Sequence, residues 1–206
     1  MASDTTAAEP ASSGAGAPGR STGRDALLAG ALDLMAREGV GDLSLRQIAS
    51  RIGTSHRMLH YHFGSREGLL VAVVEELDRR NSEMLARLTM PDDVPLRDQA
   101  WSFWTHAADT AGVYGPLFFE LASHAMLGKA HTEALAGRNV DLWLDTLTTL
   151  WTRAGMEPAA ARVRARLNLA VSRGLLHDLL LTGDRDAVDA AMADFADTSL
   201  ASISTD

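Results

Sequence analysis

The fold is decided by one stretch of the chain, residues 44–70, which reads SLRQIASRIGTSHRMLHYHFGSREGLL. It opens with the form of a capping box, in which the Ser44 hydroxyl accepts from the amide of Gln47 while the Gln47 side chain reaches back. A helix is therefore predicted to begin at Leu45. It is predicted to end at Gly53, because glycine readily adopts the left-handed conformation that terminates helices.

A second helix is predicted after this glycine. Thr54 or Ser55 can cap it, and its apolar pattern continues through Phe63. Two short helices joined by a three-residue turn with glycine form a helix-turn-helix, whose second helix enters the major groove of DNA. The residues predicted to pack inward are Leu45, Ile48, Ala49 and Ile52 on the first helix and Met58, Leu59 and Phe63 on the second.

Charge is distributed unevenly along the chain. The 206 residues include 19 basic and 27 acidic ones, for a formal net charge of −8. The segment from Ser44 to Arg66 holds four arginines, three of the seven histidines and no acidic residue. Subtracting its charge of +4 from the total leaves −12 for the rest. A protein that coats nucleic acid generally is basic throughout, so this pattern favours one local DNA-facing surface. The absence of cysteine excludes thiolate metal clusters, cysteine nucleophiles and disulfide scaffolds.

The polar residues of this segment are the candidate DNA contacts. Arg57 can read a guanine through paired hydrogen bonds or hold a phosphate. Arg66 is expected to position a phosphate at the start of the following helix. His56 and His60 also have the spacing of metal ligands, but without a third ligand nearby no metal is predicted. The full predicted set is Ser44, Arg46, Thr54, Ser55, His56, Arg57, His60, Tyr61, His62 and Arg66.

Residues 24–72 as a whole resemble the amino-terminal domain of the TetR family of transcriptional regulators. The resemblance rests on the run LRQIA at 45–49, Gly53, and the run LHYHFGSREGLL at 59–70. It implies a three-helix DNA-binding head, a helical body that binds a ligand and dimerises, and repression relieved by a small molecule. Two positions depart from the family pattern: His60 stands where tyrosine is common, and Arg66 where lysine is common.

The chain before this head is predicted to be a disordered tail over residues 1–23, since 19 of these 23 residues are Ala, Ser, Thr, Gly or Pro. It has neither the basic start nor the apolar core of a signal peptide. No apolar run reaches the roughly 18 residues of a membrane span. A cytoplasmic protein is therefore expected. No cofactor is predicted, because the G-x-G-x-x-G pattern at 14–19 neither follows a strand nor opens a helix.

From Arg24 onward, apolar residues recur at spacings of three and four, so the predicted fold class is all-α. The first helix presents Leu27, Leu28, Ala31, Leu32, Leu34 and Met35 and ends at Gly39. The prolines at 91, 95, 116 and 158 are expected to separate later helices at 66–89, 95–110, 116–127, 130–153, 158–182 and 185–203. The predicted domains are the helix-turn-helix head, 24–70, and a ligand-binding and dimerisation domain, 71–206.

The large aromatic residues cluster between residues 95 and 153, and such spacing serves either a packed core or an apolar cavity. The resemblance favours a cavity with a few polar groups that orient a ligand. The predicted pocket residues are Trp101, Trp104, His106, Phe118, Phe119, His124 and Trp143.

The last two predicted helices are apolar on more than one side, which calls for more than one packing partner. We expect them to meet their copies across a two-fold axis as a four-helix interface. The residues predicted at this dimer interface are Val163, Leu167, Val171, Leu175, Leu179, Val188, Met192 and Phe195.

The function favoured by these observations is that of a homodimeric, ligand-responsive transcriptional repressor that binds a palindromic operator in double-stranded DNA. An activator or an effector-independent DNA-binding protein is the alternative. A helical enzyme or small-molecule carrier is a remote one, because the sequence holds no G-x-S-x-G, no H-E-x-x-H and no phosphate-binding loop. No catalytic residue, metal or membrane partner is predicted.

Overall fold

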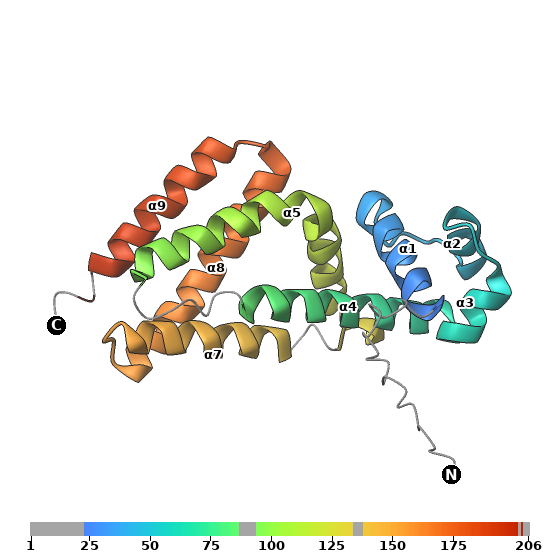
Figure 1. Cartoon of the computed structure of the whole chain (residues 1–206), viewed down its shortest axis with the longest axis horizontal. Coiled ribbons are helices and arrows are strands. Elements are labelled where there is room, and N and C mark those ends of the chain that lie inside the picture. Colours follow the sequence, from blue (N-terminus) through green and yellow to red (C-terminus); the bar gives the residue numbers. More distant parts are fainter. Residues whose placement is uncertain (1–22, 87–93, 134–137, 202, 204–206) are drawn as a thin grey trace, which may run out of the picture.

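The computed structural model describes residues 23–86, 94–133, 138–201 and 203. In these ranges the chain is helical and contains no strand, which confirms the all-α class (Figure 1). Of the predicted tail, residues 1–22 lie outside the described residues, and the first helix begins at Gly23. The elements are α1 (Gly23–Glu38), α2 (Leu45–Arg51), α3 (His56–Phe63), α4 (Arg66–Ala86), α5 (Leu96–Met126), η1 (Ala130–Thr132), α7 (Arg138–Arg153), α8 (Pro158–Thr182) and α9 (Arg185–Ala201).

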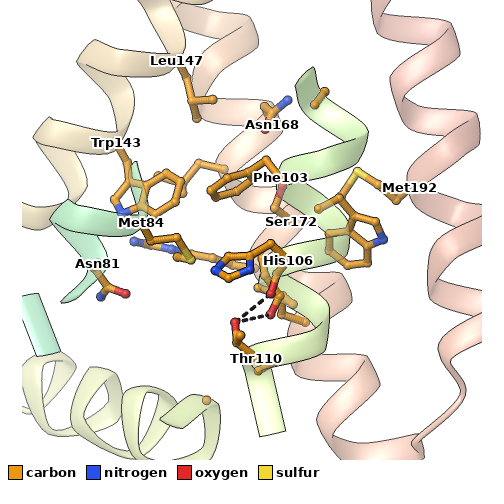
Figure 2. A pocket seen from close by; sticks show the side chains of 18 of the residues that line it. Asn81, Met84, Phe103, His106, Thr110, Trp143, Leu147, Asn168, Ser172 and Met192 are labelled. Carbon is orange, nitrogen blue, oxygen red and sulfur yellow. Dashed lines mark hydrogen bonds between the residues drawn. The ribbon is translucent and has the colours of Figure 1, made fainter. Parts of the chain in front are cut away.

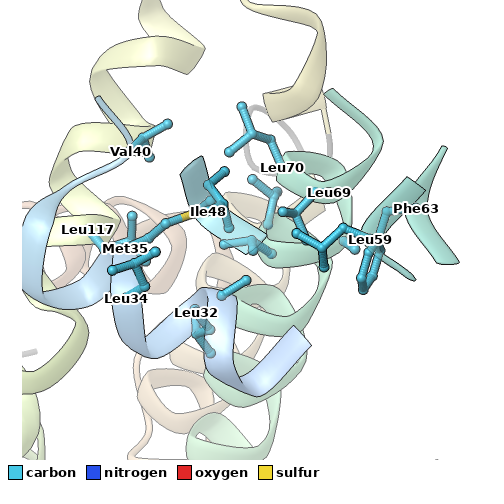
Figure 3. Close-up of a cluster of buried hydrophobic side chains, with 14 of the residues drawn as sticks. Leu32, Leu34, Met35, Val40, Ile48, Leu59, Phe63, Leu69, Leu70 and Leu117 are labelled. Carbon is cyan, nitrogen blue, oxygen red and sulfur yellow. The ribbon is translucent and has the colours of Figure 1, made fainter. Parts of the chain in front are cut away.

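The head consists of α1, α2, α3 and the first part of α4 around one apolar core (Figure 3). Each of these helices contributes a fully buried side chain: Leu32, Ile48, Leu59 and Leu69. Burial of one such side chain contributes about 1.5–3 kcal/mol to folding. The same core includes Leu117 of α5, so the head is packed against the body.

The two short helices of the head begin as their sequence predicts. Ser44 caps α2, and its capping box with Gln47 is complete. Ser55 caps α3 by accepting a hydrogen bond from the Met58 amide at 3.2 Å. Gly53, between the two helices, has a φ of +72°, which an L side chain rarely adopts. The predicted helix-turn-helix is therefore confirmed.

The long helix α5 corrects one prediction, because Pro116 lies inside it and does not separate two helices. Figure 1 shows α5 changing direction sharply at the end that faces the head. Helices kink at proline, which lacks the amide hydrogen and crowds the preceding turn. Gly115 permits close packing at this place, since a Cβ there would lie 2.8 Å from the Leu180 Cδ1 atom of α8. The kink lets one helix serve two cores: Leu117 packs in the head core and Trp104 packs against α9.

The body is formed by the rest of α4 with α5, α7, α8 and α9. One apolar cluster joins α7 to α8 and another joins α5 to α9. The indole Nε1 of Trp104 also donates to Asp189 of α9 at 2.5 Å. The predicted helix at 158–182 is confirmed, whereas the one predicted at 130–153 is present as η1 and α7, with residues 134–137 outside the described ranges. Among the described helices, none has both the length and the apolar character required to cross a membrane.

Candidate functional site

The outer surface of the head is formed by the exposed side of α3. His56, Arg57, His60 and Tyr61 are all exposed, and 79% of the Tyr61 surface is accessible. The His56 and His60 rings lie on one face with their centroids 6.1 Å apart. The described residues contain no group of three metal-ligating side chains arranged to hold a metal ion. This surface therefore offers hydrogen-bond donors and a guanidinium on a short, capped helix.

Met58 differs from what its pattern predicts, and His62 is less exposed than the other candidate contacts of α3. Met58, expected to pack inward, is 42% exposed, because it lies beside the outward face next to Arg57. His62 is half-buried, with its ring edge against Tyr61 at a centroid distance of 4.9 Å. Met58 thus adds an apolar contact to the outer surface, while Leu59 and Phe63 hold the helix in the core.

Arg66 supports the loop between α1 and α2. Its Nε donates to the Leu43 carbonyl at 2.7 Å, and its Nη2 donates to the Gly41 carbonyl at 2.6 Å. The guanidinium that the sequence assigned to a phosphate is thus held by backbone oxygens. These bonds fix the loop that leads into α2, so Arg66 stabilises the fold of the head itself.

Replacing Arg66 by lysine keeps the charge but removes the planar donor pair. We expect the free energy of unfolding to fall by about 1–3 kcal/mol, the range for hydrogen bonds to charged groups. Urea denaturation followed by circular dichroism measures this loss. Arg46→Lys on the exposed face of α2 is the matched control and should leave the midpoint unchanged. Equal midpoints for both variants would show that the loop does not depend on the guanidinium.

A cavity of about 420 Å³ lies within the body between α4, α5, α7, α8 and α9. Of the residues predicted to line it, Trp104, His106, Phe118, Phe119 and Trp143 do so. Trp101 does not, and is 38% exposed. The cavity-facing residues of α5 follow one another at steps of three and four, and Trp101 projects from the other side of the helix.

His124 is the second correction to the predicted pocket. It lies beyond the kink of α5, with its Nδ1 3.1 Å from Nε2 of the buried His131. His131 in turn contacts Glu67 of the head through both its backbone amide and its Nδ1. His124 therefore belongs to the junction between head and body.

Sequence reasoning missed the cavity residues of α4 and α8. Figure 2 shows Asn168 and Ser172 of α8, Asn81 and Met84 of α4, and Phe103 of α5 around one space. Asn168 and Ser172 are four residues apart, so they share a helix face. An Asn and a Ser at this spacing, among the leucines and valine of residues 167–176, were the signal available in the sequence.

Charged groups of α4 lie at the wall of the cavity beside Tyr114. Arg80 donates to Glu76 at 2.8 Å, and its guanidinium lies 4.8 Å from the centroid of the Tyr114 ring. Hydrogen bonds from Arg79 and then from Arg80 lower the pKa of Glu76 to about 2. The Glu76 carboxylate is therefore ionised at neutral pH and holds Arg80 against the aromatic ring.

Among the described residues, polar contacts of Tyr114, Glu120 and His131 connect the body to the head. The Tyr114 hydroxyl donates to Asp33 of α1 at 3.2 Å. Glu120, also on α5, accepts from the amide of Val40 at 2.8 Å, in the loop after α1. His131 of η1 contacts Glu67 at the start of α4. These contacts hold α5 and η1 against the head.

Some of the predicted dimer residues pack in the chain's own core, others are exposed, and Val171 is half-buried. Val188 and Met192 are buried against Trp104 in the chain's own core, which corrects their assignment to a surface. Leu175, Leu179 and Phe195 pack against the same cluster. Val163 and Leu167 of α8, in contrast, are 64% and 48% exposed.

Comparisons with known proteins agree with this arrangement. Residues 27–73 match the family described as bacterial regulatory proteins, tetR family. None of the curated proteins matches the chain. A TetR-family regulator from Streptomyces coelicolor superposes with a TM-score of 0.74 at 19% identity, covering 88% of this chain and 95% of that one. A TetR regulator from Legionella pneumophila gives 0.72 at 21% identity, with 87% and 98% covered.

A third similar structure is a putative transcriptional regulator from Saccharomonospora viridis in complex with choline. It has a TM-score of 0.69 and 21% identity, and the match covers 87% of this chain and 95% of that one. At such identities these structures establish the fold, while the match at 27–73 covers the helix-turn-helix. Residues 27–73 are thus a DNA-binding domain of the TetR family, and the chain as a whole has the fold of the TetR-family regulators to which it is similar.

Proposed function

We propose that the protein is a homodimeric transcriptional repressor that binds a palindromic operator in double-stranded DNA. A small, at least partly apolar effector releases it, and we place this activity in the cytoplasm. The observation that carries the proposal is that one helix, α5, lines the cavity and also holds the head through Tyr114 and Glu120. A ligand that displaces α5 would change the spacing of two heads relative to successive major grooves. No catalytic role is proposed.

The second copy is proposed to cover the outward face of α8. Val163, Leu167 and Leu181 are exposed there, and residues four and seven positions apart repeat on one side of a helix. Ala170 and Gly174 lie between them on the same stripe and are exposed. Small residues between larger apolar ones permit close helix packing, which supports an interface with a second copy of the chain.

The proposal is tested by selecting genomic DNA fragments with the purified protein and then screening compounds for release. We expect enrichment of a palindromic sequence and at least one compound that lowers affinity about 5- to 150-fold, the usual range of coupling between sites. Reporter expression in a strain that lacks the gene should rise. A fall in expression would indicate an activator, and failure to enrich any duplex would overturn the proposal.

Tyr114 is expected to transmit the effector signal. In Tyr114→Phe the ring remains in the cavity wall while the hydrogen bond to Asp33 is lost. The releasing compound should bind within about 2-fold of its wild-type affinity, yet its effect on operator affinity should shrink several-fold, since coupling requires a contact that differs between the two states. Isothermal titration of the compound, with and without operator, measures both quantities.

Asp33→Ala, which removes the acceptor oxygen, is the matched variant on the other side of this contact. It should reduce coupling as Tyr114→Phe does, and the double variant should show little further loss, because both changes remove one interaction. Full coupling in both single variants would exclude the Tyr114 contact as a route.

A further inference from the structure

The cavity in the body has an excess of positive charge. Its described lining contains two guanidinium groups, Arg80 and Arg173, and one carboxylate, Glu83. Glu83 is ion-paired with Arg79, which does not line the cavity. Arg80 is held by Glu76. The described lining therefore holds more guanidinium groups than carboxylates, in a largely apolar space.

Arg173 is the cation that α8 contributes to this space. Its guanidinium lies 5.7 Å from the centroid of the Phe118 ring, which also lines the cavity. Burial lowers the pKa of Arg173, because the charged form loses part of its hydration. A guanidinium has five N–H donors in a planar fork, so it can bind a ligand carboxylate in addition to its present contacts.

The neutral groups of the cavity suit an apolar body with few polar substituents. Phe103 and Trp143 meet edge to face at a centroid distance of 5.5 Å. Asn81, Asn168 and Ser172 also face the cavity (Figure 2), and their side chains make no hydrogen bond to another described residue. They offer donors and acceptors to a bound molecule, while the aromatic rings offer it apolar surface.

We propose that the effector is an aromatic carboxylic acid, with its carboxylate bound by Arg173 and its ring system against the aromatic walls. This inference rests on the proposed function, because it assigns a chemical class to the effector of that same cavity. A cation such as the choline bound by the Saccharomonospora viridis regulator would meet the wrong charge here. Attraction between a partly desolvated guanidinium and a carboxylate is much stronger than in water.

The test compares three probes with the same apolar body: 2-naphthoate, 2-naphthamide and 2-naphthyltrimethylammonium. Binding is followed by the fluorescence of the full chain, in which Trp104 and Trp143 line the cavity. We expect the carboxylate to bind about 10- to 100-fold more tightly than the amide, as charge-assisted hydrogen bonds do, and the cation to bind most weakly. Equal affinities, a preference for the cation, or no binding of any probe at millimolar concentration would overturn the proposal.

The Arg173→Gln variant tests whether Arg173 causes the preference for the carboxylate. It should remove the preference for the carboxylate while the amide binds as before, and Arg173→Lys should restore part of the preference. Because amide binding reports an intact cavity, a general loss of folding is recognised directly. A retained preference in Arg173→Gln would overturn the assignment to Arg173.

DNA binding is measured separately, so that two failures can be told apart. If 2-naphthoate binds through Arg173 but neither it nor any other compound changes affinity for the selected operator, the proposed function fails and the ligand class stands. A compound of another charge class could release the operator while the protein binds 2-naphthoate no more tightly than 2-naphthamide. In that case the ligand class fails and the proposed function stands.

Discussion

Arg57→Ala is expected to weaken operator binding by at least about 30-fold and to relax sequence preference at one position of each half-site. Arg57 lies in the first turn of α3, which Ser55 caps, and its side chain is exposed. A bidentate contact between arginine and guanine contributes about 1–3 kcal/mol of discrimination. A dimer makes the contact twice, so its loss from both half-sites is expected to cost about 2–6 kcal/mol of binding free energy. Titration of the selected operator and of its single-base variants measures both the affinity and the preference.

Arg46→Ala on α2 is the control that separates base reading from attraction to phosphate. Arg46 is also exposed and lies in the same acid-free segment. Its loss should weaken all duplexes about equally and lower the salt dependence by roughly one counterion per contact. Wild-type operator affinity in Arg57→Ala would remove Arg57 from the interface.

The head was predictable from sequence because its signals are local. The capping box of Ser44 and Gln47, the left-handed Gly53 and the apolar spacing of Ile48 and Leu59 each act within a few residues. Local signals of this kind agree with one another in the final structure. The role of Arg66 was not predictable in the same way, because its acceptors, Gly41 and Leu43, belong to a loop more than twenty residues earlier.

The body was predictable only in outline, because its packing depends on partners distant in sequence. Pro116 indicates a break locally, yet α5 continues through it with a kink. Their apolar pattern placed Val188 and Met192 at the dimer interface, but Trp104, more than eighty residues earlier, covers them within the chain. An apolar stripe indicates that the helix face is covered. It does not show whether the covering surface belongs to the same chain or to a second copy.

Leu167→Glu is expected to separate the proposed dimer into monomers. Leu167 lies on the exposed stripe of α8, between Val163 and Leu181. In a two-fold interface the same surface is used by both protomers, so each substitution introduces two carboxylates into one apolar contact. A buried charge without a partner costs about 3 kcal/mol or more, which raises the dissociation constant more than a hundredfold. Sedimentation velocity at micromolar concentration measures this change.

Operator binding should fall together with the dimer, because a monomer reads one half-site and loses the contribution of the second. Val113→Glu on α5 is the matched control, since Val113 is 55% exposed and lies outside the α8 stripe. Both variants should melt as folded proteins, because neither position is in a core. A wild-type chain that sediments as a monomer, or a Leu167→Glu variant that remains dimeric, would show that α8 does not form the interface. The two heads would then lack the connection through which the cavity is proposed to control their spacing.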